Sequence, residues 1–244
     1  MNMLLAAAAV FLAIHFLVSG TRLRDGIVGV IGEGPYMGLF SLASLGAIVW
    51  LVISFNHAQA GGNDALLYNL GAGVTHLAIP VVLLAFLIGV PGLFTPNPTS
   101  VRQEGVATKP DAVRGIVAVT RHPFLWGVVI WSAMHLALNG DEASVILFGT
   151  FFILSLLGPL SIDAKRKRKM GAAWDSFAAR TSNVPFAAVL SGRAKLNWSE
   201  LLDWRMAMAV LLFVVVLFGH ARVIGVSPFP GGWQPFLIQS EAKR

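Results

Sequence analysis

The sequence predicts an all-α fold, a polytopic transmembrane helix bundle of about six spans, with amphipathic interfacial helices between spans five and six. Of the 244 residues, 56% are hydrophobic and only 12% are charged, against roughly 25% charged residues in a typical soluble domain. The mean hydropathy is +0.72. Six apolar runs are candidates to cross a bilayer within a single membrane domain, residues 1–244: 3–19, 36–55, 70–90, 124–138, 143–162 and 204–221.

The ends of these runs carry recognisable helix signals. The run at 124–138 is short, but Pro123 suits the first position of a helix, where its missing N–H is not needed. Asn139-Gly140-Asp141 predicts a tight turn, and Asp141 is placed to cap the fifth helix. Pro80 lies inside the third run and Pro159 near the end of the fifth. Each is expected to kink its helix without preventing it from spanning.

The distribution of Lys and Arg predicts the orientation of the bundle. Fifteen of the eighteen basic residues lie in the first, third and fifth connections or just inside the sixth span, and the second and fourth connections have none. Because basic loops stay on the cytoplasmic side during insertion, both termini are expected outside, on the periplasmic face of a bacterial inner membrane. The other three basic residues follow the last span: Arg222, Lys243 and Arg244.

The first run also has one feature of a signal peptide. Val18-Ser19-Gly20 supplies small residues after an apolar stretch, as a cleavage site does. A signal peptide carries its positive charges before the apolar region, whereas here Arg22 and Arg24 follow it and no basic residue precedes it. We therefore expect a retained first helix.

Residues 163–203 are expected to lie on the cytoplasmic membrane face. The basic run 165–169 indicates an anchor for anionic lipid. Trp174, Phe177 and Trp198 stand among polar residues, which predicts one or two interfacial helices. The high pI of about 10.2 therefore reflects membrane topology, and we expect membrane lipid and no nucleic acid as a partner. The spans carry no mid-span Asp, Glu, Lys or Arg of the kind that marks a transport pathway.

The absence of cysteine narrows the possible cofactors. It excludes disulfides, thiolate ligands, iron–sulfur clusters and covalent attachment of c-type haem. Neutral imidazoles that face the interior of a bundle suit axial ligation of haem iron. A single histidine near a span end is more often an interfacial hydrogen-bonding residue, but several in one bundle favour a site. The six histidines are His15, His57, His76, His122, His135 and His220.

Helix geometry limits which histidines can cooperate. His122 and His135 are ~20 Å apart along one helix and cannot bind the same haem. His15, Ser19 and Arg22, spaced i, i+4, i+7, form a polar stripe that could ligate iron at His15 and pair a haem propionate with Arg22. The stripe also fits a polar helix end that faces water.

Depth favours a different pair. Measured from the span centres, His76 and His135 each lie ~6 Å toward the outer side, whereas His15 lies ~6 Å toward the cytoplasm. His76 is therefore the alternative partner for His135. A tilted haem would still allow His15 to pair with His135.

Several motifs resemble the NnrU family over nearly the whole chain. They are His15 to Arg24, Gly32-Glu33-Gly34-Pro35-Tyr36-Met37-Gly38-Leu39-Phe40-Ser41-Leu42, His76, Arg121-His122-Pro123, Trp131 to Asp141, and His220 to Pro230. The stretch from Arg121 to Asp141 is the most specific.

The resemblance implies a function. NnrU proteins are associated with denitrification, and a plant relative, 15-cis-zeta-carotene isomerase, carries non-covalent haem b between two histidines. Carried over to this chain, the ligands are His15 and His135. We expect five residues to contact the cofactor: Ser19, Arg22, Arg121, His122 and Trp131.

The expected function is redox-dependent isomerisation of a lipophilic polyene, or a role as redox accessory to a partner protein. No catalytic residue is assigned. One alternative is a non-catalytic assembly factor for nitrogen-oxide reductases. Another follows from a weaker resemblance to isoprenylcysteine carboxyl methyltransferases, which implies S-adenosylmethionine binding near Arg121-His122-Pro123 and the motif Gly171 to Phe177.

Overall fold

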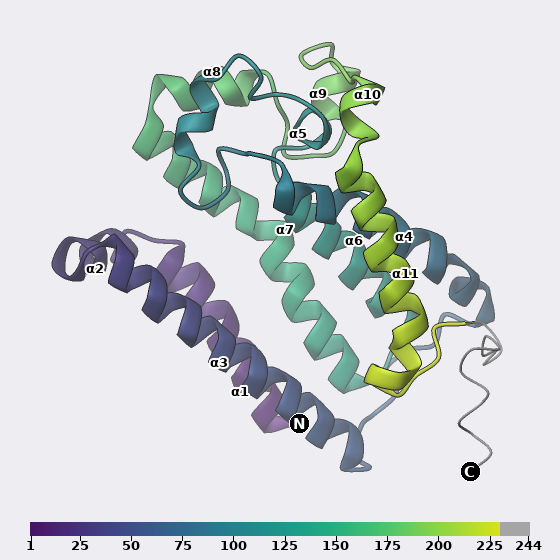
Figure 1. The fold of residues 1–244 in the computed structure, drawn as a ribbon. Helices are drawn as coiled ribbons and strands as arrows, with labels where there is room; N and C mark the ends of the chain where they lie inside the picture. The colour runs from purple at the N-terminus through teal and green to yellow at the C-terminus, as the bar shows by residue number, and fades with distance from the viewer. Residues whose placement is uncertain (230–244) are drawn as a thin grey trace.

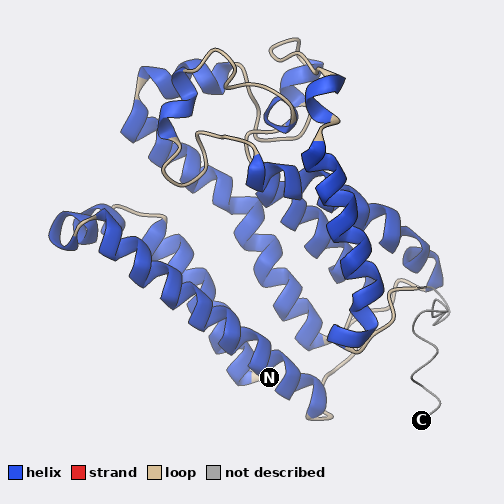
Figure 2. Cartoon of the chain, viewed as in Figure 1, coloured by secondary structure: helices blue, strands red, loops and turns tan. Residues whose placement is uncertain are grey.

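A computed structural model describes residues 1–229, and this part of the chain is helical throughout, with no β-strand beyond an isolated bridge (Figures 1 and 2). Pro230, Lys243 and Arg244 lie outside the described residues. The helices, in chain order, are α1 (Asn2–Ala13), the π-helical η1 (Ile14–Ser19), α2 (Leu23–Ile31), α3 (Glu33–Ala60), α4 (Ala72–Phe94), the 3₁₀ turn η2 (Glu104–Thr108), α5 (Ile116–Val119), α6 (Pro123–Leu138), α7 (Glu142–Met170), α8 (Ala172–Ala179), α9 (Ala187–Leu190), α10 (Trp198–Leu201) and α11 (Trp204–Ile224).

Five of the six expected spans are long and apolar enough to cross a membrane. They are Asn2–Ser19, Glu33–Ala60, Ala72–Phe94, Glu142–Met170 and Trp204–Ile224. The sixth, α6, is apolar but has only 16 residues, which is about 24 Å of helix and less than the ~30 Å of hydrocarbon. The polytopic helical bundle is thus confirmed, with α6 as its short member.

The helix ends follow the chemistry of the sequence. Pro123 begins α6, and the side chain of Asp141 accepts a hydrogen bond from Ser144 N at 2.8 Å, which caps α7. Both predictions are confirmed. Helix α7 runs on beyond the expected end, through the basic run, and stops where Gly171 adopts a φ of +54°. Glycine adopts this left-handed conformation without a steric penalty.

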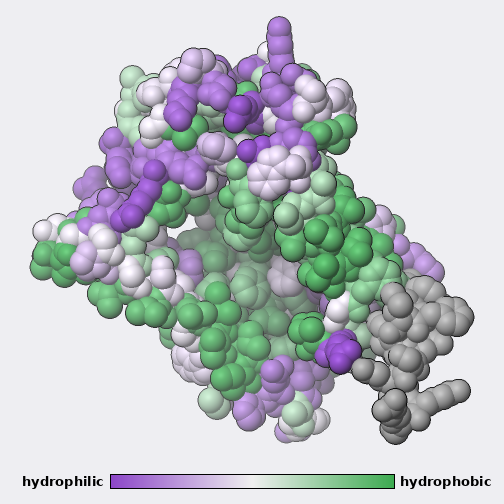
Figure 3. Space-filling view, in the orientation of Figure 1, coloured by the Kyte–Doolittle hydropathy of each residue, from purple (hydrophilic) through white to green (hydrophobic). Residues whose placement is uncertain are grey.

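The long helices form two groups that meet at α7 (Figure 1). Helix α6 lies between α4 and α7, and α11 packs on α4. Helices α1 and α3 form an antiparallel hairpin whose outer end is joined to α7 by a cluster of buried apolar side chains: Leu4, Ala7, Ala8, Leu51, Ala143 and Leu147. Figure 3 shows green hydrophobic side chains over the long helices, with a hollow beside the hairpin.

Helices α4 and α6 approach closely at small residues. A Cβ atom built on Gly127 would lie 2.6 Å from Gly89 Cα, and one on Gly92 would lie 2.7 Å from the ring of Pro123. Small residues at such a crossing let helix backbones pack tightly in a bilayer, where the hydrophobic effect does not drive helix association. This contact fixes α6, and with it His135, against α4.

The short helices α5 and α8–α10, with the loops between them, form a layer with its own core at one end of the bundle. Trp174 and Phe177 of α8 are buried against Val117 and Val119 of α5. These two rings therefore pack in a protein core, because α5, which was not recognised in the sequence, covers them. Trp198 is 64% exposed, as an interfacial residue should be. Hydrophilic side chains gather over this end in Figure 3.

Candidate functional site

Two histidines from different helices lie at the ends of one series of aromatic rings. The His15 ring is 4.5 Å from that of Phe11, and Phe11 is 5.7 Å from Phe151 of α7. Phe151 is 5.9 Å from Trp131, whose ring is 4.7 Å from that of His135 on α6. The structure therefore places both predicted ligands on the side of their helices that faces α7. It does not bring them together, because three rings lie between them.

Each of these imidazoles has one nitrogen occupied and one available. His15 Nδ1 donates to Phe11 O at 2.8 Å, and His135 Nδ1 donates to Trp131 O at 2.8 Å. A carbonyl only accepts, so the proton must be on Nδ1 in both rings. Within residues 1–229, neither Nε2 has a hydrogen-bond partner. A histidine that donates its Nδ1–H to a carbonyl while Nε2 stays free has the arrangement of a metal ligand.

His15 lies in the π-helical segment η1 rather than in α-helix. Single π-turns inside α-helices are rare and occur frequently at functional sites. The sequence analysis assumed regular α-helical spacing here, so the π-turn was missed. The turn presents the His15 ring to Phe40 of α3, 5.3 Å away, as well as to Phe11.

His135 also lines a cavity of about 280 Å³ between α4, α6 and α11. His220 of α11 lies on the same wall and donates through Nδ1 to Val226 O at 2.7 Å. No role was predicted for His220, since nothing in the sequence indicates that α6 and α11 line one cavity. Most of the remaining lining is apolar: Ala78, Ile79, Val82, Leu138, Phe213, Val216 and Leu217 among others.

The depth-matched alternative, His76, lies elsewhere. Thr75 and Ile79 of α4 line the cavity, whereas His76 is exposed on another face of the helix. The structure does not bring His76 and His135 to a common site.

Side chains of α7 donate hydrogen bonds to the backbone near the polar stripe of the first helix. Lys165 Nζ donates to Ser19 O at 2.8 Å, and Ser161 Oγ donates to Gly20 O at 3.3 Å. Arg22 is exposed. Lys165, expected to anchor lipid, instead points inward and holds the end of the first span at Ser19.

The other cations at this end of α7 hold the loop before α5. Glu104 of η2 pairs with Arg166, and with Lys169 at 2.9 Å. Partial burial alone would raise the pKa of Glu104, but the hydrogen bond from Lys169 and the charge of Arg166 outweigh it and lower this pKa to about 2.

Arg121 and His122 converge on one carboxylate. Arg121 Nε and Nη2 donate to Asp163 Oδ2 at 3.0 and 2.5 Å, and His122 Nε2 donates to Oδ1 at 2.7 Å. Burial lowers the pKa of His122, and the hydrogen bond to Asp163 opposes that effect. The ring is therefore neutral at pH 7 and Nε2 carries its proton. This pairing with Asp163 was not predicted from the sequence.

A model of the NnrU protein family matches residues 3–228. The chain belongs to the NnrU family. It is 27% identical to the chloroplastic 15-cis-zeta-carotene isomerase of Zea mays over 197 residues, covering 79% of this chain and 52% of that one. The corresponding isomerase of Arabidopsis thaliana is 27% identical over 214 residues, covering 84% and 56%. The chain thus spans about half the length of these curated relatives. No solved structure gives a significant match.

In this NnrU-family chain, the two motifs of the methyltransferase resemblance do meet. The guanidinium of Arg121 lies 5.9 Å from the ring centre of Trp174. Both are largely enclosed, and Trp174 packs on Phe177. The contact ties α8 to the start of α6, and the hydrogen bonds of Arg121 go to Asp163 rather than into a cavity.

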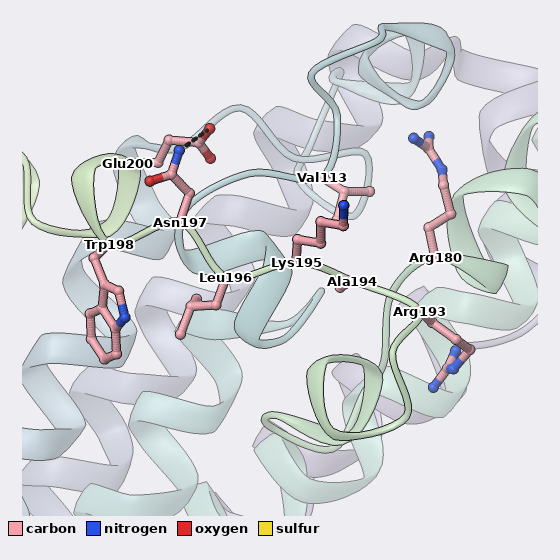
Figure 4. Close-up of a pocket in the computed structure, with 9 residues that line it drawn as sticks. All are labelled: Val113, Arg180, Arg193, Ala194, Lys195, Leu196, Asn197, Trp198 and Glu200. Carbon is pink, nitrogen blue, oxygen red and sulfur yellow. Dashed lines mark hydrogen bonds between the residues drawn. The ribbon is translucent and has the colours of Figure 1, made fainter.

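A second cavity of this family member, about 630 Å³, lies among the loops and short helices at the opposite end of the bundle from His135 (Figure 4). Arg180 and Arg193 extend away from each other there, and Arg193 is bonded to the carbonyls of Ala179 and Thr181. Asn197 and Glu200 are hydrogen-bonded across one side. It is an open polar depression of the surface, and its side chains serve the local fold.

In the described part of this NnrU-family chain, no group of three or more His, Asp or Glu side chains could hold a bare metal ion. The available donors are single imidazoles. Single imidazoles suit a metal whose other ligands come from a macrocycle.

Proposed function

We propose that this NnrU-family protein binds haem b non-covalently, with His15 and His135 as axial ligands, and isomerises a cis double bond of a lipophilic polyene. The observation that carries the proposal is the similarity to 15-cis-zeta-carotene isomerases over most of the chain. In the present structure, His15 and His135 each keep a free Nε2, which agrees with it.

The surroundings of the two histidines fit the group. A porphyrin needs flat apolar neighbours, and the rings of Phe148 and Phe151 flank Trp131 at 5.4 and 5.9 Å. When bound, haem would supply a redox-active iron with an exchangeable axial position. Because Phe11, Phe151 and Trp131 connect the two imidazoles in series, ligation by both requires these rings or the α1–α3 hairpin to shift. The surface beside the hairpin is hollowed (Figure 3).

Access from the bilayer supports a neutral apolar substrate. Helices α3 and α11 expose apolar side chains along their length, for example Leu42 at 68% and Val215 at 59%. The cavity beside His135 is walled largely by apolar residues and can take a short hydrocarbon segment. In this proposal the substrate enters sideways from the membrane core.

The orientation completes the proposal: a bacterial inner membrane protein with its N-terminus in the periplasm. Residue 1 lies at the end of the bundle opposite α5 and α8–α10 (Figure 1). Most of the basic residues belong to the connections at the α5 and α8–α10 end, which the positive-inside rule assigns to the cytoplasm.

Spectra of protein expressed with ample haem test the ligands. We expect a Soret band and a b-type pyridine haemochrome, most of which is lost in His135→Ala and His15→Ala. His76→Ala is the matched control and keeps the band. Colourless wild-type protein would refute the haem assignment. If His76→Ala loses the Soret band and His15→Ala keeps it, the second ligand is His76 rather than His15.

A role as redox accessory would need the same imidazoles. Measuring the conversion of a substrate distinguishes that role from isomerase activity. Purified, reduced protein in lipid should convert a 15-cis polyene to the trans form at that bond. A haem-loaded protein that leaves every such polyene unchanged would support the accessory role.

The methyltransferase alternative is favoured by one contact, that of Arg121 with Trp174. It predicts saturable S-adenosylmethionine binding by protein in lipid, weakened by Arg121→Ala. We rank it second because the hydrogen bonds of Arg121 and His122 are already directed to Asp163.

A further inference from the structure

The hydroxyl of Tyr36 is buried without a partner. Tyr36 is 6% exposed, and its Oη has no hydrogen-bond partner within residues 1–229. Buried polar groups in folded proteins are nearly all hydrogen-bonded, and an unpaired one needs an explanation. Tyr68 illustrates the usual state, because its hydroxyl donates to Leu136 O. The Tyr36 hydroxyl is therefore a donor for a group that the chain itself does not supply.

Tyr36 is separated from the proposed ligand His15 by one aromatic ring, that of Phe40. Its ring stacks on that of Phe40, with centres 5.9 Å apart and planes inclined by 20°. Phe40 in turn lies 5.3 Å from His15. On its other side, Tyr36 is covered by the guanidinium of Arg24, 5.4 Å from the ring centre. The hydroxyl thus belongs to the cytoplasmic end of the α1–α3 hairpin, between an imidazole and a cation.

The same end of the hairpin holds a cation without a carboxylate. Lys165 is half-buried, and its hydrogen bonds go to Ser19 O at 2.8 Å and Ser19 Oγ at 3.5 Å. In the described chain it forms no ion pair: the charge of Arg24 repels it, and the carboxylate of Asp25 attracts it without direct contact. Arg24 is paired with Glu33 at 3.0 Å and with Asp25 at 3.4 Å. A half-buried ammonium that no carboxylate contacts is unfavourable, so both Tyr36 and Lys165 would be stabilised by an anion that they could contact.

We propose that Tyr36 Oη and Lys165 Nζ, supported by Arg24, form a binding site for a carboxylate next to His15, and that this carboxylate is a propionate of the haem. The inference rests on the proposed function, since it takes the haem ligated by His15 as the source of the carboxylate. It replaces Arg22, the propionate partner expected from the sequence, with residues that are enclosed in the hairpin. A hydroxyl and an ammonium can both donate to one carboxylate, and donors to a charged acceptor make the stronger hydrogen bonds.

The test compares protohaem with its dimethyl ester, which has the same ring and iron but no carboxylate. Full-length apoprotein in detergent is titrated with each, and the Soret band gives the affinity. Wild type should bind protohaem more tightly than the ester. Tyr36→Phe should weaken protohaem binding about tenfold or more and leave ester binding unchanged. Lys165→Gln should show the same pattern and serves as the second variant.

The matched control is Ser54→Ala, which removes another unpartnered buried hydroxyl from the same helix, far from His15. It should bind both haems as wild type does. If Tyr36→Phe and Lys165→Gln bind protohaem as wild type does, or lose both haems equally, the carboxylate site is refuted while the haem assignment stands. If wild type binds neither haem, the proposed function fails and this inference fails with it.

Discussion

Replacing Asp163 by asparagine removes the charge that holds Arg121 and His122 while leaving the volume of the side chain almost unchanged. Arg121 and His122 have side-chain exposures of 15% and 1%, and Asp163 of 20%. Removing one partner of a buried ion pair costs about 3–5 kcal/mol. Because Arg121 and Asp163 keep some contact with solvent, which screens their charges, we take the lower end, about 3 kcal/mol.

Thermal unfolding in mild detergent measures this loss. For a chain of this size, 1 kcal/mol shifts Tm by about 2–4 °C, so Asp163→Asn should lower Tm by roughly 6–12 °C. The control is Asp175→Asn, which removes an exposed pair with Lys167 of 3.4 Å and should change Tm by at most about 2 °C, since such pairs contribute little. If the two variants have the same Tm, the cluster does not stabilise the junction of α6 and α7.

Three other changes probe packing, pH dependence and capping. Gly127→Ala should cost about 1–3 kcal/mol, because its Cβ would meet Gly89 Cα at 2.6 Å; Gly149→Ala, with nothing within 4 Å, should leave Tm unchanged or raise it. Glu104, with its pKa lowered to about 2, stabilises the protein fully above its ordinary pKa of about 4.5, and this contribution is lost as the pH falls toward 2. The difference in Tm between wild type and Glu104→Gln should therefore shrink across that range, and a constant difference would argue against the ion pairs. Asp141→Ala removes the cap of α7 and should lower the free energy of unfolding by about 1 kcal/mol, which the shift in Tm measures. Asp141→Asn should retain most of the stability that the cap provides.

The spans and several helix ends could be predicted because they depend on local chemistry. An uncharged run of about twenty residues has few alternatives to a spanning helix. Pro123 and Asp141 act on backbone groups within three positions of themselves, so the sequence contains their partners. The π-turn at His15 is different, since one extra residue in a helical turn leaves the hydrophobic pattern almost unchanged. The spacing of His15, Ser19 and Arg22 therefore gave no indication of it.

The pairings of the site could not be predicted, because they join residues far apart in the chain. Asp163 meets Arg121 across 42 positions, and Lys165 meets Ser19 across 146. Both contacts depend on which helix packs against α7. Trp174 shows the same limit, since an aromatic residue among polar neighbours fits both a membrane surface and a small cytoplasmic core. The presence of α5 decides between them.

The way the α1–α3 hairpin is attached limits how His15 could reach an iron bound at His135. The outer end of the hairpin is fixed to α7 by the cluster of Leu4, Leu51 and Leu147, and its cytoplasmic end is fixed by Lys165 at Ser19. A rigid swing of the hairpin would break both attachments. A bend within η1 need break neither, because η1 begins after Leu4 and ends at Ser19. If both imidazoles bind one iron, the π-turn is therefore the segment that adjusts.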